Sequence, residues 1–219
     1  MGTKFSTRIW VSVVGIASIF FGSKGYADTV ISVADFGLKP DTRENAVAYV
    51  QKAIEACRGK EPVTLVFPEG RYDFWPQYAH EKNYYETNTY DVFPKRLAML
   101  FEGFHNITVD GNGSQFVMHD RIQPITVENC DGVTLKNFSI DWDIPLTAQA
   151  RVIKVGSDFF EIEINVLESP YIIEDGKLVF VGEGWKSALG SMIEFESDTH
   201  FVVPGTGDLV LGKIGRAHV

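Results

Sequence analysis

Cysteine is scarce in this 219-residue sequence, which contains only Cys57 and Cys130. Two cysteines cannot build the disulfide framework of a small secreted scaffold. No Cys/His spacing resembles a zinc site either, so we expect no bound metal. Cys57 ends a predicted helix, and Cys130 lies in a later strand repeat. We therefore expect buried, unpaired thiols, although an exported protein can form a disulfide.

Basic residues are also few, with 20 Lys and Arg against 29 Asp and Glu and a net charge of −9. Phosphate binding requires clustered Lys and Arg, so we expect no nucleic-acid partner. Aromatic residues are more plentiful, at 13% of the chain. Carboxylates and aromatic rings suit neutral sugars, although net charge by itself reports only solubility.

A sustained apolar run is found only near the N-terminus, over residues 9–21. Lys4 and Arg8 precede the run, and small residues stand shortly before Asp28. This pattern is typical of a secretory signal peptide over residues 1–27. We expect an exported protein, periplasmic or extracellular, with no membrane span after cleavage. An uncleaved membrane anchor is the alternative.

The stretch from Val33 to Phe74 is the most informative part of the sequence. It predicts a strand, a Gly/Pro/Asp turn, a helix over 42–57, and a strand that ends in a Phe-Pro-Glu-Gly turn. That order opens many right-handed parallel β-helices of the pectin-lyase type. The helix has one apolar stripe, which we expect to cover the open end of the solenoid. The stripe consists of Ala46, Val47, Val50, Ala53, Ile54 and Cys57.

Short alternating strands recur further along the chain. The run from His105 to Gly111 resembles the run from Cys130 to Asn137, so that Ile107 and Val133 are equivalent, as are Val109 and Leu135. Between Phe74 and the first repeat, residues 75–96 are irregular and aromatic, and predict either a functional loop or a packed surface cover. We assign residues 28–146 to the N-terminal part of a parallel β-helix.

The pattern changes at Thr147. Residues 152–155 and 159–164 predict an antiparallel hairpin, and a second hairpin surrounds Asp175-Gly176. We interpret residues 147–204 as a small inserted antiparallel β-domain. Residues 205–212 then begin the return to the β-helix.

The last residues, 213–219, resemble the translation of a common sequencing-library adapter. We expect them to be an artefact and the chain to be an N-terminal fragment, with a genuine polar tail as the alternative. No functional argument is placed on His218 or Arg216.

The sharpest constellation of reactive side chains is Asp141-Trp142-Asp143. On a strand, residues two apart lie roughly 7 Å apart on one face, and inverting glycosidases separate their carboxyl groups by roughly 6.5–9.5 Å. We expect the two carboxylates to contact sugar, with direct catalysis as a further possibility. Any Asp-x-Asp strand supplies this spacing, so a polar outer strand edge is the alternative.

Two more residues are candidates for the substrate site. Arg121 can pair with Asp141 or Asp143 and keep them ionised, or form an ordinary corner salt bridge. Trp185 can stack on the apolar C–H groups of a sugar, or simply pack within the inserted domain.

Four segments together resemble a known family: VADFGLKPDTRENAVAYVQKAIEAC, LVFPEGRYDFWPQYAHEKNYYETN, VTLKNFSIDWDIPLTAQARV and SPYIIEDGKLVFVGEGWKS. Along most of its length the chain resembles the bacterial α-1,3-galactosidases of glycoside hydrolase family 110. The resemblance implies release of terminal α-1,3-linked galactose from blood-group-B-type or linear glycans, with inversion and without a cofactor. It also implies a parallel β-helix with an inserted β-barrel-like domain.

The same resemblance places the acid and base carboxylates in coils after the insertion, beyond this sequence. The catalytic residues are therefore unknown, and we expect this stretch alone to be inactive. Asp141, Trp142, Asp143, Arg121 and Trp185 remain candidate substrate contacts. The alternatives are a pectin-type lyase or polygalacturonase, whose acidic substrate favours a basic groove, and a non-catalytic glycan-binding β-solenoid.

Overall fold

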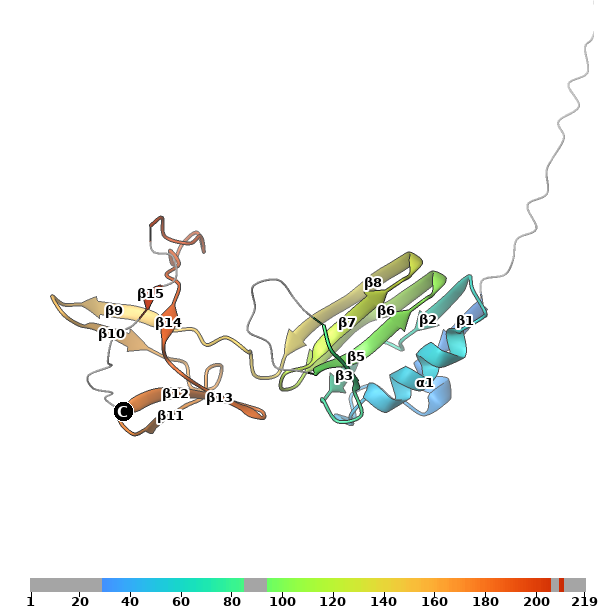
Figure 1. The fold of residues 1–219 in the computed structure, drawn as a ribbon, viewed down its shortest axis with the longest axis horizontal. Coiled ribbons are helices and arrows are strands. Elements are labelled where there is room, and N and C mark those ends of the chain that lie inside the picture. The colour runs from blue at the N-terminus through green and yellow to red at the C-terminus, as the bar shows by residue number, and fades with distance from the viewer. Residues whose placement is uncertain (1–28, 85–93, 206–208, 211–219) are drawn as a thin grey trace, which may run out of the picture.

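A computed structural model describes residues 29–84, 94–205 and 209–210. The predicted signal peptide, the adapter-like tail and part of the aromatic segment 75–96 lie outside these residues. Strands dominate the described chain, which has one α-helix and one short 3-10 helix (Figure 1). The predicted all-β class is therefore confirmed. No helix in the described ranges has the length and hydropathy needed to cross a membrane.

The first unit contains both helices and eight strands of the described chain. The helices are η1 (Val33–Phe36) and α1 (Val47–Cys57). The strands are β1 (Thr29–Ser32), β2 (Val63–Val66), β3 (Arg71–Phe74), β4 (His80–Lys82), β5 (Lys95–Glu102), β6 (His105–Met118), β7 (Gln123–Glu128) and β8 (Asp131–Trp142).

Strands of the first unit stack mostly in parallel. Strand β6 pairs with β2 through its first half, with β3 through its second half, and with β8 along most of its length. A second sheet pairs β5 with β7 in parallel. The register of β6 and β8 sets Ile107 opposite Val133 and Val109 opposite Leu135, so the predicted equivalence of the two repeats is confirmed.

The parallel stack exists because each strand contributes apolar residues to the same side. Tyr72 and Phe74 lie level with Phe116 and Met118 of β6, and all four are buried. The rings of Phe67 and Phe116 are 4.7 Å apart, and Phe138 of β8 stacks on Phe116 at 4.8 Å. Packed aromatic pairs of this kind add to the free energy gained by burying their area.

Helix α1 packs its predicted apolar stripe against this core, with Val47, Val50 and Ala53 fully buried. It begins at Val47, so the predicted start at residue 42 was wrong. Asp41 and Arg43 adopt positive φ angles of 62° and 56°, which a helix does not allow.

The two cysteines are unpaired, as expected. Cys57 is buried and its thiol donates to the carbonyl of Ala53. Cys130 is half-buried and donates to Phe101. Burial raises the pKa of Cys57 to about 11, so this thiol stays protonated at neutral pH.

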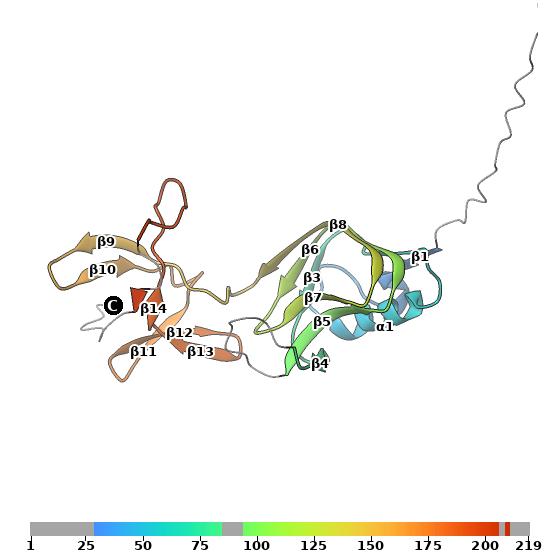
Figure 2. The same ribbon diagram turned by 45° about the horizontal axis from the view of Figure 1, so that its top comes forward.

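The second unit consists of short antiparallel pairs that lie beyond the C-terminal end of β8 (Figures 1 and 2). The predicted hairpins form, as β9 with β10 and as β11 with β12 around Asp175-Gly176. Its strands are β9 (Arg151–Val155), β10 (Phe160–Glu163), β11 (Tyr171–Glu174), β12 (Lys177–Gly182), β13 (Trp185–Ala188), β14 (Ser191–Met192) and β15 (Leu209–Val210).

Candidate functional site

Polar side chains gather on the face of β3, β6 and β8 that points away from the aromatic core. Asp73 alternates with the buried rings of Tyr72 and Phe74, and the register sets Asp73 level with Val117 and Asp141. Side chains two apart on a strand share one face, so the residues two positions before or after these three lie on the same outer face.

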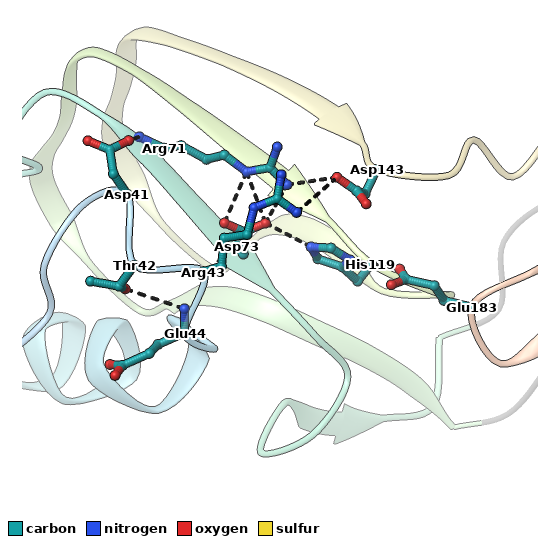
Figure 3. A network of polar contacts seen from close by, with 9 residues as sticks. All are labelled: Asp41, Thr42, Arg43, Glu44, Arg71, Asp73, His119, Asp143 and Glu183. Atoms are coloured by element: carbon teal, nitrogen blue, oxygen red, sulfur yellow. Dashed lines mark hydrogen bonds and ion pairs between the residues drawn. The ribbon is translucent and has the colours of Figure 1, made fainter. Parts of the chain in front are cut away.

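Arg71 joins two carboxylates on this face (Figure 3). Its Nη2 lies 2.6 Å from Oδ1 of Asp73 and 2.7 Å from Oδ1 of Asp143, just past the end of β8. Arg43 approaches the same Asp143 oxygen at 4.0 Å but is largely exposed. The Asp73 side chain is fully buried, so its charge depends on these neighbours rather than on water.

His119 continues the network from the end of β6. Its Nε2 lies 2.9 Å from Oδ1 of Asp73, and its Nδ1 lies 2.7 Å from Oε2 of Glu183 (Figure 3). The ring is 2% exposed and stacks on Trp75, with centroids 3.8 Å apart and planes inclined by 12°. His119 is therefore enclosed on its edges by acids and on one face by an indole.

The Asp73 carboxyl is held in its charged form. Burial alone raises the pKa of a carboxyl group, but hydrogen bonds from Arg71 and His119 more than offset it. The pKa of Asp73 therefore lies below its ordinary value.

Asp73, His119 and Asp143 are close enough to share a metal ion, since one ligand atom from each lies within 4.8 Å of the others. The guanidinium of Arg71, however, already contacts both carboxylates. A cation thus occupies the position between them, and we assign no metal to this cluster.

The two predicted acids, Asp141 and Asp143, lie in different environments. Asp143 enters the network through Arg71, whereas Asp141 is exposed and its Oδ1 accepts the backbone N–H of Trp142. The expected pairing of Arg121 with Asp141 or Asp143 was wrong. Arg121 is exposed and forms no ion pair with any described residue, and Asp143 pairs with Arg71 instead.

Trp142 points the other way, as its alternation with Asp141 and Asp143 predicted. Its ring packs on the core beside Met118, and its indole N–H donates to the carbonyl of Asp120 at 3.2 Å.

Trp185 is the first residue of β13, and its indole packs on Gly182, its partner on β12. A Cβ at Gly182 would stand 2.2 Å from Cε2 and Nε1 of the indole. The neighbouring Gly184 abuts Asp120, because a Cβ there would be 2.3 Å from Oδ2. A hollow of about 330 Å³ adjoins this turn, lined by Val181, Gly182, Gly184, Trp185 and Lys186.

Sequence reasoning missed the centre of the cluster, namely Arg71, Asp73, His119 and Glu183. Arg71 and Asp73 alternate on a strand as Asp141 and Asp143 do, and that signal was present in the sequence. No local signal exists for Glu183, which comes to His119 from a distant part of the chain.

The outer sheet face thus brings carboxylates and a guanidinium group together around His119, which the indole of Trp75 covers. Comparison with known proteins identifies the relatives of this chain. Residues 148–218 match the family model of GLAA-B beta-barrel domain I.

The chain is 60% identical over 182 residues to Alpha-1,3-galactosidase B of Bacteroides thetaiotaomicron, covering 83% of this chain and 30% of that protein. It is 36% identical over 169 residues to Alpha-1,3-galactosidase A of Shewanella woodyi, covering 76% and 28%. It is also 36% identical over 205 residues to Alpha-1,3-galactosidase B of Phocaeicola vulgatus, covering 92% and 32%.

The chain is therefore a homologue of the bacterial alpha-1,3-galactosidases, and the resemblance stated from the motifs is confirmed. It spans about 30% of the length of the curated relatives that it matches.

Proposed function

We propose that the complete protein is an exo-acting glycoside hydrolase that releases terminal α-1,3-linked galactose from glycans with inversion of the anomeric carbon. The observation that carries the proposal is the 60% identity to a protein named Alpha-1,3-galactosidase B over most of this chain. The outer-face cluster supports it, because carboxylates paired with an arginine suit the hydroxyl groups of a sugar.

The finer architecture that we propose is a right-handed parallel β-helix with an inserted β-barrel-like domain. Parallel pairing of β2, β6 and β8 and of β5 with β7 supports the stacking of successive coils. The match of residues 148–218 to a β-barrel domain supports the insertion.

In this proposal the described residues supply one side of the galactose subsite. Asp143 lies beside two arginines, and Asp141 is exposed on the strand next to Val117, so both can accept hydrogen bonds from sugar hydroxyl groups. The acid and base carboxylates belong to other parts of the complete protein, and we expect the present stretch alone to release no galactose.

Assay of the complete protein on an α-1,3-galactosyl oligosaccharide tests the function. We expect free galactose, with the β-anomer appearing first in the proton NMR spectrum because the reaction inverts. Unsaturated uronates from pectate would replace the proposal by a lyase. Binding of the oligosaccharide without turnover would replace it by a glycan-binding module.

Two variants test the subsite. Asp141→Asn and Asp143→Asn should each lower kcat/KM about tenfold, since a hydrogen bond to a charged group is lost while side-chain shape is kept. Asp131→Asn, an exposed change at the start of the same strand, is the matched control. Unchanged kinetics in both test variants would remove these residues from the site.

We also propose that residues 1–27 direct export. N-terminal sequencing of the purified protein should then begin at Asp28, and an intact Met1 would contradict the proposal.

A further inference from the structure

One side chain of the second unit reaches the outer face of the first. Glu183 lies between β12 and β13, and its carboxylate contacts the ring of His119 at 2.7 Å. Next to it, Gly184 lies against Asp120 so closely that no Cβ fits. These two contacts place the β12–β13 turn directly on the end of β6, as Figure 3 shows for Glu183 and His119.

Both ring nitrogens of His119 face carboxylate oxygens, Asp73 on one side and Glu183 on the other. The imidazole ring therefore bridges two acids that belong to different units.

The charged groups around this bridge come from three directions. Asp73 and Arg71 belong to β3, Asp143 follows β8, and Glu183 belongs to the turn. Arg71 neutralises Asp73 and Asp143 from the far side of His119. Glu183 is therefore the acid whose position depends mainly on His119.

The position of Glu183 also fixes that of Trp185. Only Gly184 separates them, and the indole of Trp185 rests on the backbone of Gly182 on the other side of Glu183. The contact between the indole and Gly182 couples the position of the ring to that of the turn.

We propose that the contact chain Glu183–His119–Asp73 is a latch that holds the β12–β13 turn, and with it Trp185, against the outer face of the sheet. His119 is a positioning residue: it sets where the indole meets substrate and takes no part in bond cleavage. The expected effect on substrate binding rests on the proposed galactosidase function, whereas the expected effect on the position of the turn does not.

The test uses Glu183→Gln in the complete protein, because this change keeps side-chain shape and the residue is one-third exposed, so the fold is retained. Glu174→Gln is the matched control, since it removes an exposed ion pair to Lys186 on the same group of strands. His119→Gln and the double variant complete a cycle.

In the structural arm, nitroxide labels are attached through Ser139→Cys and Ser187→Cys, both exposed, and the distance between them is measured by pulsed electron resonance. We expect a single narrow distance in the unchanged protein and in Glu174→Gln. The distribution should broaden in Glu183→Gln. An equally narrow distribution of distances in Glu183→Gln would overturn the latch, whether or not the protein releases galactose.

In the activity arm, KM for an α-1,3-galactoside should rise at least about fivefold in Glu183→Gln with kcat unchanged. The double variant should raise KM no further than either single variant, since one contact chain is broken in each case. Loss of kcat with unchanged KM would contradict a positioning role. Absence of galactose release from the unchanged protein would count against the proposed function and leave the distance measurement decisive for the latch.

Discussion

Asp73 is a buried carboxylate that two side chains, Arg71 and His119, keep charged. Because its pKa is lowered by folding, the folded state binds a proton less readily than the unfolded state. The stability it contributes is present above the unfolded pKa, at about pH 4, and is lost as the pH falls through the lower folded value.

Asp73→Asn should therefore lower the free energy of unfolding at pH 7 by about 3 kcal/mol, because the charge of Arg71 loses its buried partner. It should also flatten the loss of stability as the pH falls below about 4. Urea unfolding across this range measures both effects, with the exposed Asp131→Asn as control. A variant that keeps the acid slope of the unchanged protein would show that another carboxyl group causes it.

At the residue scale, the sequence predicted some members of the site and not their partners. Asp143 was predicted from its spacing to Asp141, and its position on the polar face is the consequence of strand alternation. Its pairing with Arg71 depends on which strands lie side by side, since the two residues are 72 positions apart in the sequence. Local spacing carries no information on that register.

Strands β6 and β8 form the clearest repeat in the molecule. Asn106 and Gly132 occupy equivalent corners and both have positive φ, at 55° and 69°. Further along, Gly111 of β6 meets β8 so closely that a Cβ would stand 2.5 Å from Cβ of Phe138 and 2.7 Å from the carbonyl oxygen of Asn137. The approach of two backbones at this corner requires glycine.

Gly111→Ala should destabilise the first unit by about 1–3 kcal/mol, since the added methyl group forces one backbone away from the other. Thermal or urea unfolding measures the loss. Gly190→Ala is the control, because the nearest atom to its added Cβ is 3.9 Å away. Equal stability of the two variants would mean that the backbones of β6 and β8 can separate at this corner without lowering the free energy of unfolding.

At the element scale, hairpins and repeats were predicted correctly because their signals are local. The Asp175-Gly176 turn and the match of Ile107 with Val133 follow from short patterns. The start of α1 was predicted too early because Asn45 forms a parallel β-bridge with Asp73, and the backbone N–H of Ala46 donates to the carbonyl of Asp73. These long-range contacts keep the residues before Val47 out of the helix and override local propensity.

At the scale of the whole molecule, the two units differ in how well they bury apolar residues. The first has a continuous core, whereas the second exposes large apolar side chains. Val155, Leu167 and Phe201 are 77%, 86% and 72% exposed. Apolar surface of this kind promotes association between molecules.

We expect this chain to bind a hydrophobic dye such as ANS and to self-associate as its concentration rises. Val155→Lys with Phe201→Lys should reduce both effects without changing unfolding of the first unit. Sedimentation and dye fluorescence measure them, and Thr134→Lys on exposed β8 is the control. A monomer that binds no dye would contradict the expectation.

The pairing of β6 with β8 also bears on how the chain reaches its native state. Every contact in this ladder joins residues from successive repeats, so a long loop must close before any of the ladder's hydrogen bonds form. Proteins dominated by such non-local pairing fold slowly, because conformational entropy is lost before the stabilising contacts form. The hairpins of the second unit close over a few residues and form early, which leaves docking of the stacked repeats as the slow step of refolding.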